Sequence, residues 1–351
     1  MREAFGAEFA GAEGFLNSPT YGLPPQFLLE AVHRCVADWG SGTMDATSFD
    51  EPVRLGRGGY AALVGVPAES VTMAGSVSAA LALVAAAIPD GSRVAVLKNE
   101  FTSTTFPFAA QAARGVTLTE LSEEELVGTA AAYDVVSLSL VQSANGAVSD
   151  PAALRDAVAG TDTITVLDVT QAAGWKRLDL GWVDVSVAAV YKWLLAPRGT
   201  AWMSVSERVA ARMTPHAANW YGGEDPWQSI YGLPLRLAAD ARRFDTSPAW
   251  LGVLGAGLTL PWLASLDRAA VEAHTVGLAN RLRTEIGLPQ QDSAIVAIPA
   301  DDTADTAGAA GRLQRAGIRA SVRAGAVRVG FHLYNTDDDL DRLLDTLGAN
   351  R

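Results

Sequence analysis

Short apolar runs rich in valine alternate with helical patterns through the first two-thirds of the chain. Four of these runs lack a strict alternation of polar and apolar residues, which predicts strands covered on both faces of a sheet; they occupy residues 93–98, 134–140, 163–168 and 184–189. Between two of them, Asp150 and Pro151 form a typical helix start, with a capping residue followed by proline. Strands alternating with helices predict an α/β fold with a mostly parallel sheet, which binds ligands at the carboxyl ends of its strands.

The pattern changes near residue 266, where a smaller unit is predicted. A helical stretch covers roughly residues 251–286, and Pro261 is expected to kink or break it. A strand, a helix, a hairpin around Ala324-Gly325 and a last helix follow, which together predict a smaller α+β domain. We therefore predict a large domain of residues 15–250 and a small domain of residues 1–14 and 251–351, which includes the linking helix.

The composition argues against several classes of partner. The net charge is −12 and no basic run exists, so nucleic acid is not expected as a partner. The longest uncharged apolar stretches, residues 76–89 and 251–266, are too short or interrupted by Pro261, so no membrane span is expected. Cys35 is the only cysteine, which excludes an intrachain disulfide and favours a cytoplasmic location. The histidines are not paired at metal-ligand spacing, so no metal site is expected.

Two charged residues follow neighbouring predicted strands. Asp168 ends one strand, where its carboxylate either pairs with a protonated pyridine nitrogen of a cofactor or merely caps the next turn. Lys192 lies 192 − 168 = 24 residues further on, just past the next strand. A lysine packed against a sheet has a lowered pKa, which makes its neutral amine available for imine formation, whereas an ordinary loop lysine stays solvated and charged.

Two further segments contain groups suited to anions. Ser76 opens an alanine-rich helix, whose first amides and serine hydroxyl suit a phosphate, although a serine-capped core helix has the same pattern. Arg328 interrupts an apolar strand of the smaller unit. Its guanidinium either clamps a substrate carboxylate or forms a structural ion pair between the domains.

Taken together, these segments resemble the class V aminotransferase family of fold-type I enzymes, which use pyridoxal 5'-phosphate (PLP). The family includes cysteine desulfurases, selenocysteine lyases, kynureninases and isopenicillin-epimerase-like proteins. The resemblance covers nearly the whole chain, and two parts are the most specific: the series Asp168…Gln171…Lys192-Trp193-Leu194 and the ending Arg328…Tyr334-Asn335-Thr336. It implies a homodimer with a shared active site.

The resemblance also implies roles for individual residues. Lys192 would hold PLP as a Schiff base and move the α-proton, while Asp168 would pair with the pyridine nitrogen. Arg328 and Asn17 would bind the substrate. Further cofactor contacts are implied for Gln171, Ser76, Val77, Phe101, Ser143 and Tyr191, and for Ser247, which would reach the phosphate of the partner subunit.

The implied function is that of a PLP-dependent aminotransferase or lyase, acting on an amino acid through an external aldimine and an α-carbanion. An epimerase or racemase and a non-catalytic PLP-binding protein are the alternatives within this family resemblance. An NAD-dependent enzyme on an α/β sheet is a third interpretation, but the chain lacks a glycine fingerprint after its first strand.

Three departures from the family pattern bear on function. Many members have a serine and a histidine where this chain has Ala189 and Tyr191, so Tyr191 is expected to replace part of the phosphate site. Residues 246–248 read Thr-Ser-Pro rather than Gly-Thr-Pro. Residues 321–327 form a predicted tight hairpin without the nucleophilic cysteine of desulfurases, which disfavours persulfide chemistry through a protein thiol.

Overall fold

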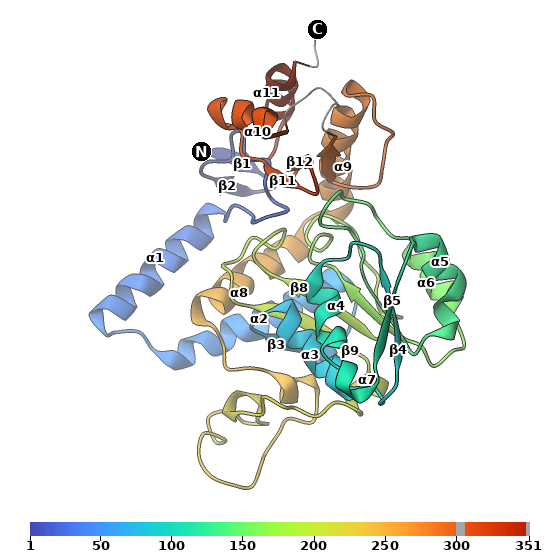
Figure 1. Ribbon diagram of the computed structural model, residues 1–351. Helices are drawn as coiled ribbons and strands as arrows, with labels where there is room; N and C mark the ends of the chain where they lie inside the picture. The colour runs from blue at the N-terminus through green and yellow to red at the C-terminus, as the bar shows by residue number, and fades with distance from the viewer. Residues whose placement is uncertain (300–305, 349–351) are drawn as a thin grey trace.

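The computed structural model describes residues 1–299 and 306–348, and its largest element is a seven-stranded sheet (Figure 1). Among the described strands of this sheet, β9 alone runs opposite to the other six. The predicted α/β fold with a mostly parallel sheet is therefore confirmed. In spatial order the strands are β3 (Val71–Ala74), β9 (Ala201–Val205), β8 (Val185–Ala189), β7 (Ile164–Asp168), β6 (Val135–Ser139), β4 (Arg93–Leu97) and β5 (Thr117–Leu121).

Helices cover both faces of this sheet, as continuous apolar strands require. Strands β6 to β9 are buried at every residue. Alternate strand residues contribute to two separate apolar cores, one on each face. The first core is closed by α2 (Asp50–Val64), α5 (Glu123–Thr129), α6 (Pro151–Val158) and α8 (Trp250–Ser265), and the second by α3 (Val77–Ala87), α4 (Thr102–Ala109) and α7 (Glu207–Ala210).

The predicted long helix of residues 251–286 is two helices, and the position of the break differs from the prediction. Pro261 lies inside α8, which ends after Ser265. The next helix, α9 (Arg268–Glu285), begins at Asp267, whose carboxylate accepts hydrogen bonds from the first amides of that helix. A capping aspartate therefore sets the boundary, because it satisfies amides that would otherwise lack acceptors.

A smaller antiparallel sheet, of order β10-β12-β11, forms the second unit together with α9, α10 (Thr306–Arg315) and α11 (Asp337–Leu347). Its strands are β10 (Ile295–Ile298), β11 (Ser321–Arg323) and β12 (Ala326–Gly330). The predicted hairpin is present, and Ala324 and Gly325 both have positive φ at its turn. The proposed bounds of the two domains remain predictions; α8 itself packs against α2 in the core of the larger unit.

The N-terminal segment connects the two units. A short ribbon of β1 (Arg2–Ala4) and β2 (Ala7–Phe9) lies near α11 (Figure 1), and Asn17 then pairs with Gly330 at the end of β12. The chain continues into α1 (Gln26–Ser41), which projects from the body. No helix among the described residues is long and apolar enough to cross a membrane. The same residues contain no group of three side chains able to hold a metal ion.

Candidate active site

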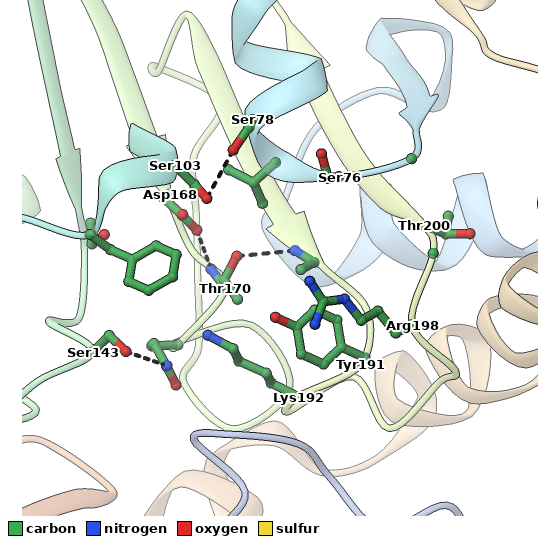
Figure 2. Close-up of a pocket in the computed structure, with 17 residues that line it drawn as sticks. Ser76, Ser78, Ser103, Ser143, Asp168, Thr170, Tyr191, Lys192, Arg198 and Thr200 are labelled. Atoms are coloured by element: carbon green, nitrogen blue, oxygen red, sulfur yellow. Dashed lines mark hydrogen bonds between the residues drawn. The ribbon is translucent and has the colours of Figure 1, made fainter. Parts of the chain in front are cut away.

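A cavity of about 250 Å³ lies at the carboxyl ends of β6, β7 and β8 (Figure 2). Because these parallel strands end at one edge of the sheet, residues far apart in the sequence meet there. Eight of the residues singled out in the sequence line it: Ser76, Val77, Phe101, Ser143, Asp168, Gln171, Tyr191 and Lys192. A cavity thus lies at the sheet edge where the sequence predicts a site, and the roles of its residues remain predictions.

Lys192 places a buried amine in this cavity. Its side chain follows β8, the residue is only 7% exposed, and Nζ lies 5.3 Å from the centre of the Phe101 ring. No described residue accepts a hydrogen bond from Nζ or pairs with it as a carboxylate within 4 Å. Burial lowers the pKa of Lys192 to about 8, although the charge of Asp168 partly opposes this shift. The amine is therefore partly neutral near physiological pH, as a nucleophile requires.

Asp168 provides the negative charge of the site. It is the last residue of β7 and is buried, and its Oδ1 accepts a hydrogen bond of 2.8 Å from the Thr170 amide. Burial raises the pKa of Asp168, while the hydrogen bonds from Thr170 and the charge of Lys192 lower it. A buried carboxylate of this kind is stabilised most by a protonated partner, such as a pyridinium nitrogen, because the positive charge of the partner compensates its own negative charge.

The side chain of Gln171 is held in one orientation by its neighbours. Trp193 Nε1 donates to Gln171 Oε1 at 2.7 Å, so the amide nitrogen must face the other way. That nitrogen donates to Ser143 Oγ at 3.1 Å (Figure 2) and to the Pro19 carbonyl at 3.0 Å. Gln171 thus connects the cavity to the loop after β6 and to the N-terminal segment.

The opposite end of the cavity is the start of α3. Ser76 caps this helix, since its Oγ accepts a hydrogen bond of 3.2 Å from the Ala79 amide. The amides of Val77 and Ser78 have no acceptor within the helix and lie at its positive end. The Ser76 hydroxyl, the free amides of Val77 and Ser78 and the helix dipole together suit an anionic group, which the sequence predicts to be a phosphate.

Arg328 does not line the cavity wall but contacts it through Ser143. Its Nη1 donates to both the carbonyl and the Oγ of Ser143, and its Nη2 donates to Thr20 Oγ1 at 2.9 Å. Within the described ranges, no carboxylate lies within ion-pair distance of this guanidinium. Burial lowers the pKa of Arg328 to about 10. Burying a cation without a counter-charge costs free energy, and a bound anionic substrate would reduce that cost.

The remaining two predicted residues lie outside the cavity. Asn17 is beside β12, and its Oδ1 is buried without a hydrogen-bond partner among the described residues. Ser247 is exposed in the segment that follows Asp245, where the Thr246 amide donates to the carbonyl of Met73 in β3. Its predicted contact is with a partner subunit, so a single chain leaves that prediction open.

Two residues important to the site were not recognised from the sequence. Glu100 is buried and accepts hydrogen bonds from the Phe101 amide and from Ser139 and Gln142, which fixes the loops after β4 and β6. Arg198 lines the cavity next to Tyr191. The Pro-Arg-Gly turn that contains Arg198 was visible in the sequence, but a turn does not reveal which way its side chain points.

These residues fit PLP. An unpartnered buried amine, a buried carboxylate, a ring beside the amine and the open amides of a helix start all face one space. Lys192 would hold the cofactor, Asp168 would face its ring nitrogen and the start of α3 would take its phosphate. The donor set contains no competing metal-ligand group among the described residues.

Comparison with known proteins agrees with the fold described above. The profile of the Aminotransferase class-V family matches residues 46–302, which include every residue that lines the cavity. The chain is 25% identical to the uncharacterized aminotransferase YcbU of Bacillus subtilis, over 92% of this chain and 91% of that protein. It is 25% identical to isopenicillin N epimerase of Streptomyces clavuligerus, over 95% and 94%. The structure of the cystine C-S lyase C-DES has the same fold, with a TM-score of 0.84 and 17% identity over 95% of this chain and 97% of that one.

Proposed function

Because the chain belongs to the class V aminotransferase family, we propose that it is a PLP-dependent enzyme that acts at the α-carbon of an amino acid, as an aminotransferase or a lyase. The observation that carries this proposal is the buried amine of Lys192, which lies unpaired in a cavity that also contains the Asp168 carboxylate. When bound, PLP withdraws electrons from the substrate's α-carbon.

Three residues of the chain have separate roles in the reaction at that carbon. Lys192 binds the cofactor and, once released by the substrate amine, takes the proton from the α-carbon at Nζ, since its lowered pKa leaves part of the amine neutral. Asp168 keeps the ring nitrogen protonated by supplying a buried negative charge. Arg328 binds the substrate carboxylate, in exchange for its hydrogen bonds to Ser143 and Thr20.

The position of the thiol argues against desulfuration through a protein cysteine. Cys35 lies half-buried on α1, outside the set of residues that line the cavity, and its pKa is raised by burial and by Asp38. A thiol with a raised pKa is a poor nucleophile. The turn of the β11–β12 hairpin, at Ala324 and Gly325, carries no sulfur. Transamination or a lyase reaction without a protein thiol is therefore favoured.

Epimerisation at the α-carbon is the second candidate. It is favoured by the similarity to isopenicillin N epimerase, which extends over 95% of the chain. An epimerase needs a proton donor on each face of the α-carbon. Phe101 lines the cavity and has no ionisable group, so Lys192 would have to work with Tyr191 or with a residue from a partner.

A homodimer is part of the proposal. Large apolar side chains are exposed on the single chain, including Trp39 at 68%, Tyr231 at 87% and Leu233 at 89%. Exposed apolar groups of this size support association with a second copy. Light scattering at micromolar concentration should give twice the 36.7 kDa of the chain; a mass of one chain would remove Ser247 from the site.

One experiment tests the cofactor and the reaction together. The purified protein, loaded with PLP, should absorb between roughly 300 and 500 nm, and Lys192→Ala should shift or abolish this band. A panel of L- and D-amino acids is then added in heavy water, and the products are separated. An α-keto acid indicates transamination, loss of a side-chain group indicates a lyase, and exchange of the α-proton with inversion indicates an epimerase. Absence of any band after incubation with PLP would refute the proposal.

A further inference from the structure

Arg198 is a cation without a counter-ion at the edge of the cavity. Its guanidinium lies 5.2 Å from the centre of the Tyr191 ring, and the residue lines the cavity together with Gly199 and Thr200. Within residues 1–299 and 306–348, no carboxylate lies within 4 Å of it, and no oxygen accepts a hydrogen bond from it. An arginine that is held by a ring and has all its N–H groups free is prepared to bind an anion.

The place of Arg198 in the cavity indicates which anion. Figure 2 shows the guanidinium over Tyr191 on the side of the cavity that contains Ser76, whereas Ser143 and Lys192 Nζ lie on the other side. The amides at the start of α3 therefore face the same end of the space as the guanidinium. Arg198 is exposed at the mouth of this end, whereas Arg328 is buried and contacts the far end through Ser143. The two arginines thus lie toward opposite ends of the cavity.

The neighbouring side chains leave this anion site short of donors. Ala189 has no hydroxyl, and the buried Thr200 Oγ1 faces α8, where a Cβ on Gly252 would lie 2.4 Å from it. Ser76 Oγ accepts the hydrogen bond of the Ala79 amide, which leaves its single O–H for an anion. A dianionic group at this end would therefore depend on Arg198 for most of its compensating charge.

We propose that Arg198, which lies beside the ring of Tyr191, binds the phosphate of the cofactor and replaces the donor that Ala189, without a hydroxyl, does not supply. This inference rests on the proposed function, since it requires PLP in the cavity. The arginine provides two parallel N–H groups to the phosphate oxygens, while Ser76 and the amides of Val77 and Ser78 bind from the opposite side. The Tyr191 ring restricts the guanidinium before binding, which reduces the entropy lost when the anion binds.

The test compares PLP with pyridoxal, which lacks the phosphate. The apoprotein is titrated with each compound, and binding is followed by absorbance. Arg198→Gln should weaken PLP by about 10- to 100-fold, the contribution of a charge-assisted hydrogen bond, and leave pyridoxal unchanged. Arg198→Lys should recover part of the loss. Tyr191→Leu, which removes the ring beside the guanidinium, should weaken PLP and leave pyridoxal unchanged.

Arg323→Gln is the matched control. Arg323 is an exposed arginine whose charge acts on Lys192, as does that of Arg198, but it does not line the cavity. It should leave the PLP-to-pyridoxal ratio unchanged. Phosphorus NMR of the bound cofactor gives a second readout, since loss of Arg198 should let the phosphate titrate nearer its free value.

Each result has one meaning. Equal weakening of PLP and pyridoxal by Arg198→Gln, or no weakening of either, overturns the inference. Retained PLP affinity with an increased KM for amino acids also overturns it and assigns Arg198 to the substrate. If the wild-type protein captures neither compound, the proposed function itself fails, and this inference fails with it.

Discussion

The lowered pKa of Lys192 makes a quantitative prediction about how the apoprotein captures PLP. Burial brings the pKa from the ordinary value of 10.5 to about 8. At pH 7, an amine with a pKa of 8 is neutral in about one molecule in ten, against roughly 0.03% for an ordinary lysine. Lys192 should therefore capture PLP about 300-fold faster at pH 7 than an exposed lysine of equal intrinsic reactivity.

The pH dependence follows from the same value. Only the neutral amine attacks the aldehyde, so the capture rate should increase about tenfold per pH unit below about pH 8 and level off above it. Stopped-flow absorbance with apoprotein between about pH 6 and pH 10 measures this profile. Asp168→Asn should move the midpoint to lower pH, because the charge of Asp168 raises the pKa of Lys192.

The site of capture can be read directly, because the chain has only three lysines: Lys98, Lys176 and Lys192. Lys98 pairs with Glu125 at 3.4 Å, and Lys176 pairs with Glu272 at 3.3 Å. Borohydride reduction and peptide mapping should find PLP on Lys192, and Lys98→Arg is the matched control with unchanged capture. A midpoint near pH 10, or cofactor on either of the paired lysines, would show that burial does not activate Lys192.

Three other substitutions test separate parts of the structure. Arg328→Lys should raise the KM for the amino acid about 10- to 100-fold in steady-state assays, because lysine cannot form two parallel hydrogen bonds to a carboxylate. The affinity for PLP should stay unchanged. An unaltered KM would place the substrate carboxylate elsewhere. Phe101→Leu should weaken PLP several-fold in a binding titration, since aromatic stacking contributes about 0.5–1.5 kcal/mol, and unchanged affinity would argue that the ring does not contact the cofactor. Arg57→Leu should lower the free energy of unfolding in urea by about 3–5 kcal/mol, because it leaves the buried Asp245 carboxylate without its ion pair of 2.5 Å; a loss below about 1 kcal/mol would contradict this.

Local sequence patterns were sufficient for the parts of the structure that depend on neighbouring residues. The four valine-rich runs are strands because their side chains are apolar on both faces, and Asp150 and Pro151 start α6 because one caps its amides and the other suits its first position. The order of Asp168 and Lys192 after successive strands also predicts that both lie at one sheet edge, where both line the cavity. These features depend on period, capping and chain order, which a sequence states directly.

The tertiary structure decided what depends on residues distant in the chain. β9 pairs along one edge with β3, more than a hundred residues earlier in the chain. The contact of Arg328 with Ser143 spans 185 positions and no local pattern encodes it. Arg198 lines the cavity with its guanidinium 5.2 Å from the centre of the Tyr191 ring, which the Pro-Arg-Gly turn by itself does not reveal. The sequence by itself determined which chemical groups the protein has and which elements carry them. Long-range packing decided which of those groups share one low-dielectric space. The pKa of Lys192 is lowered because packing buries its amine in that space.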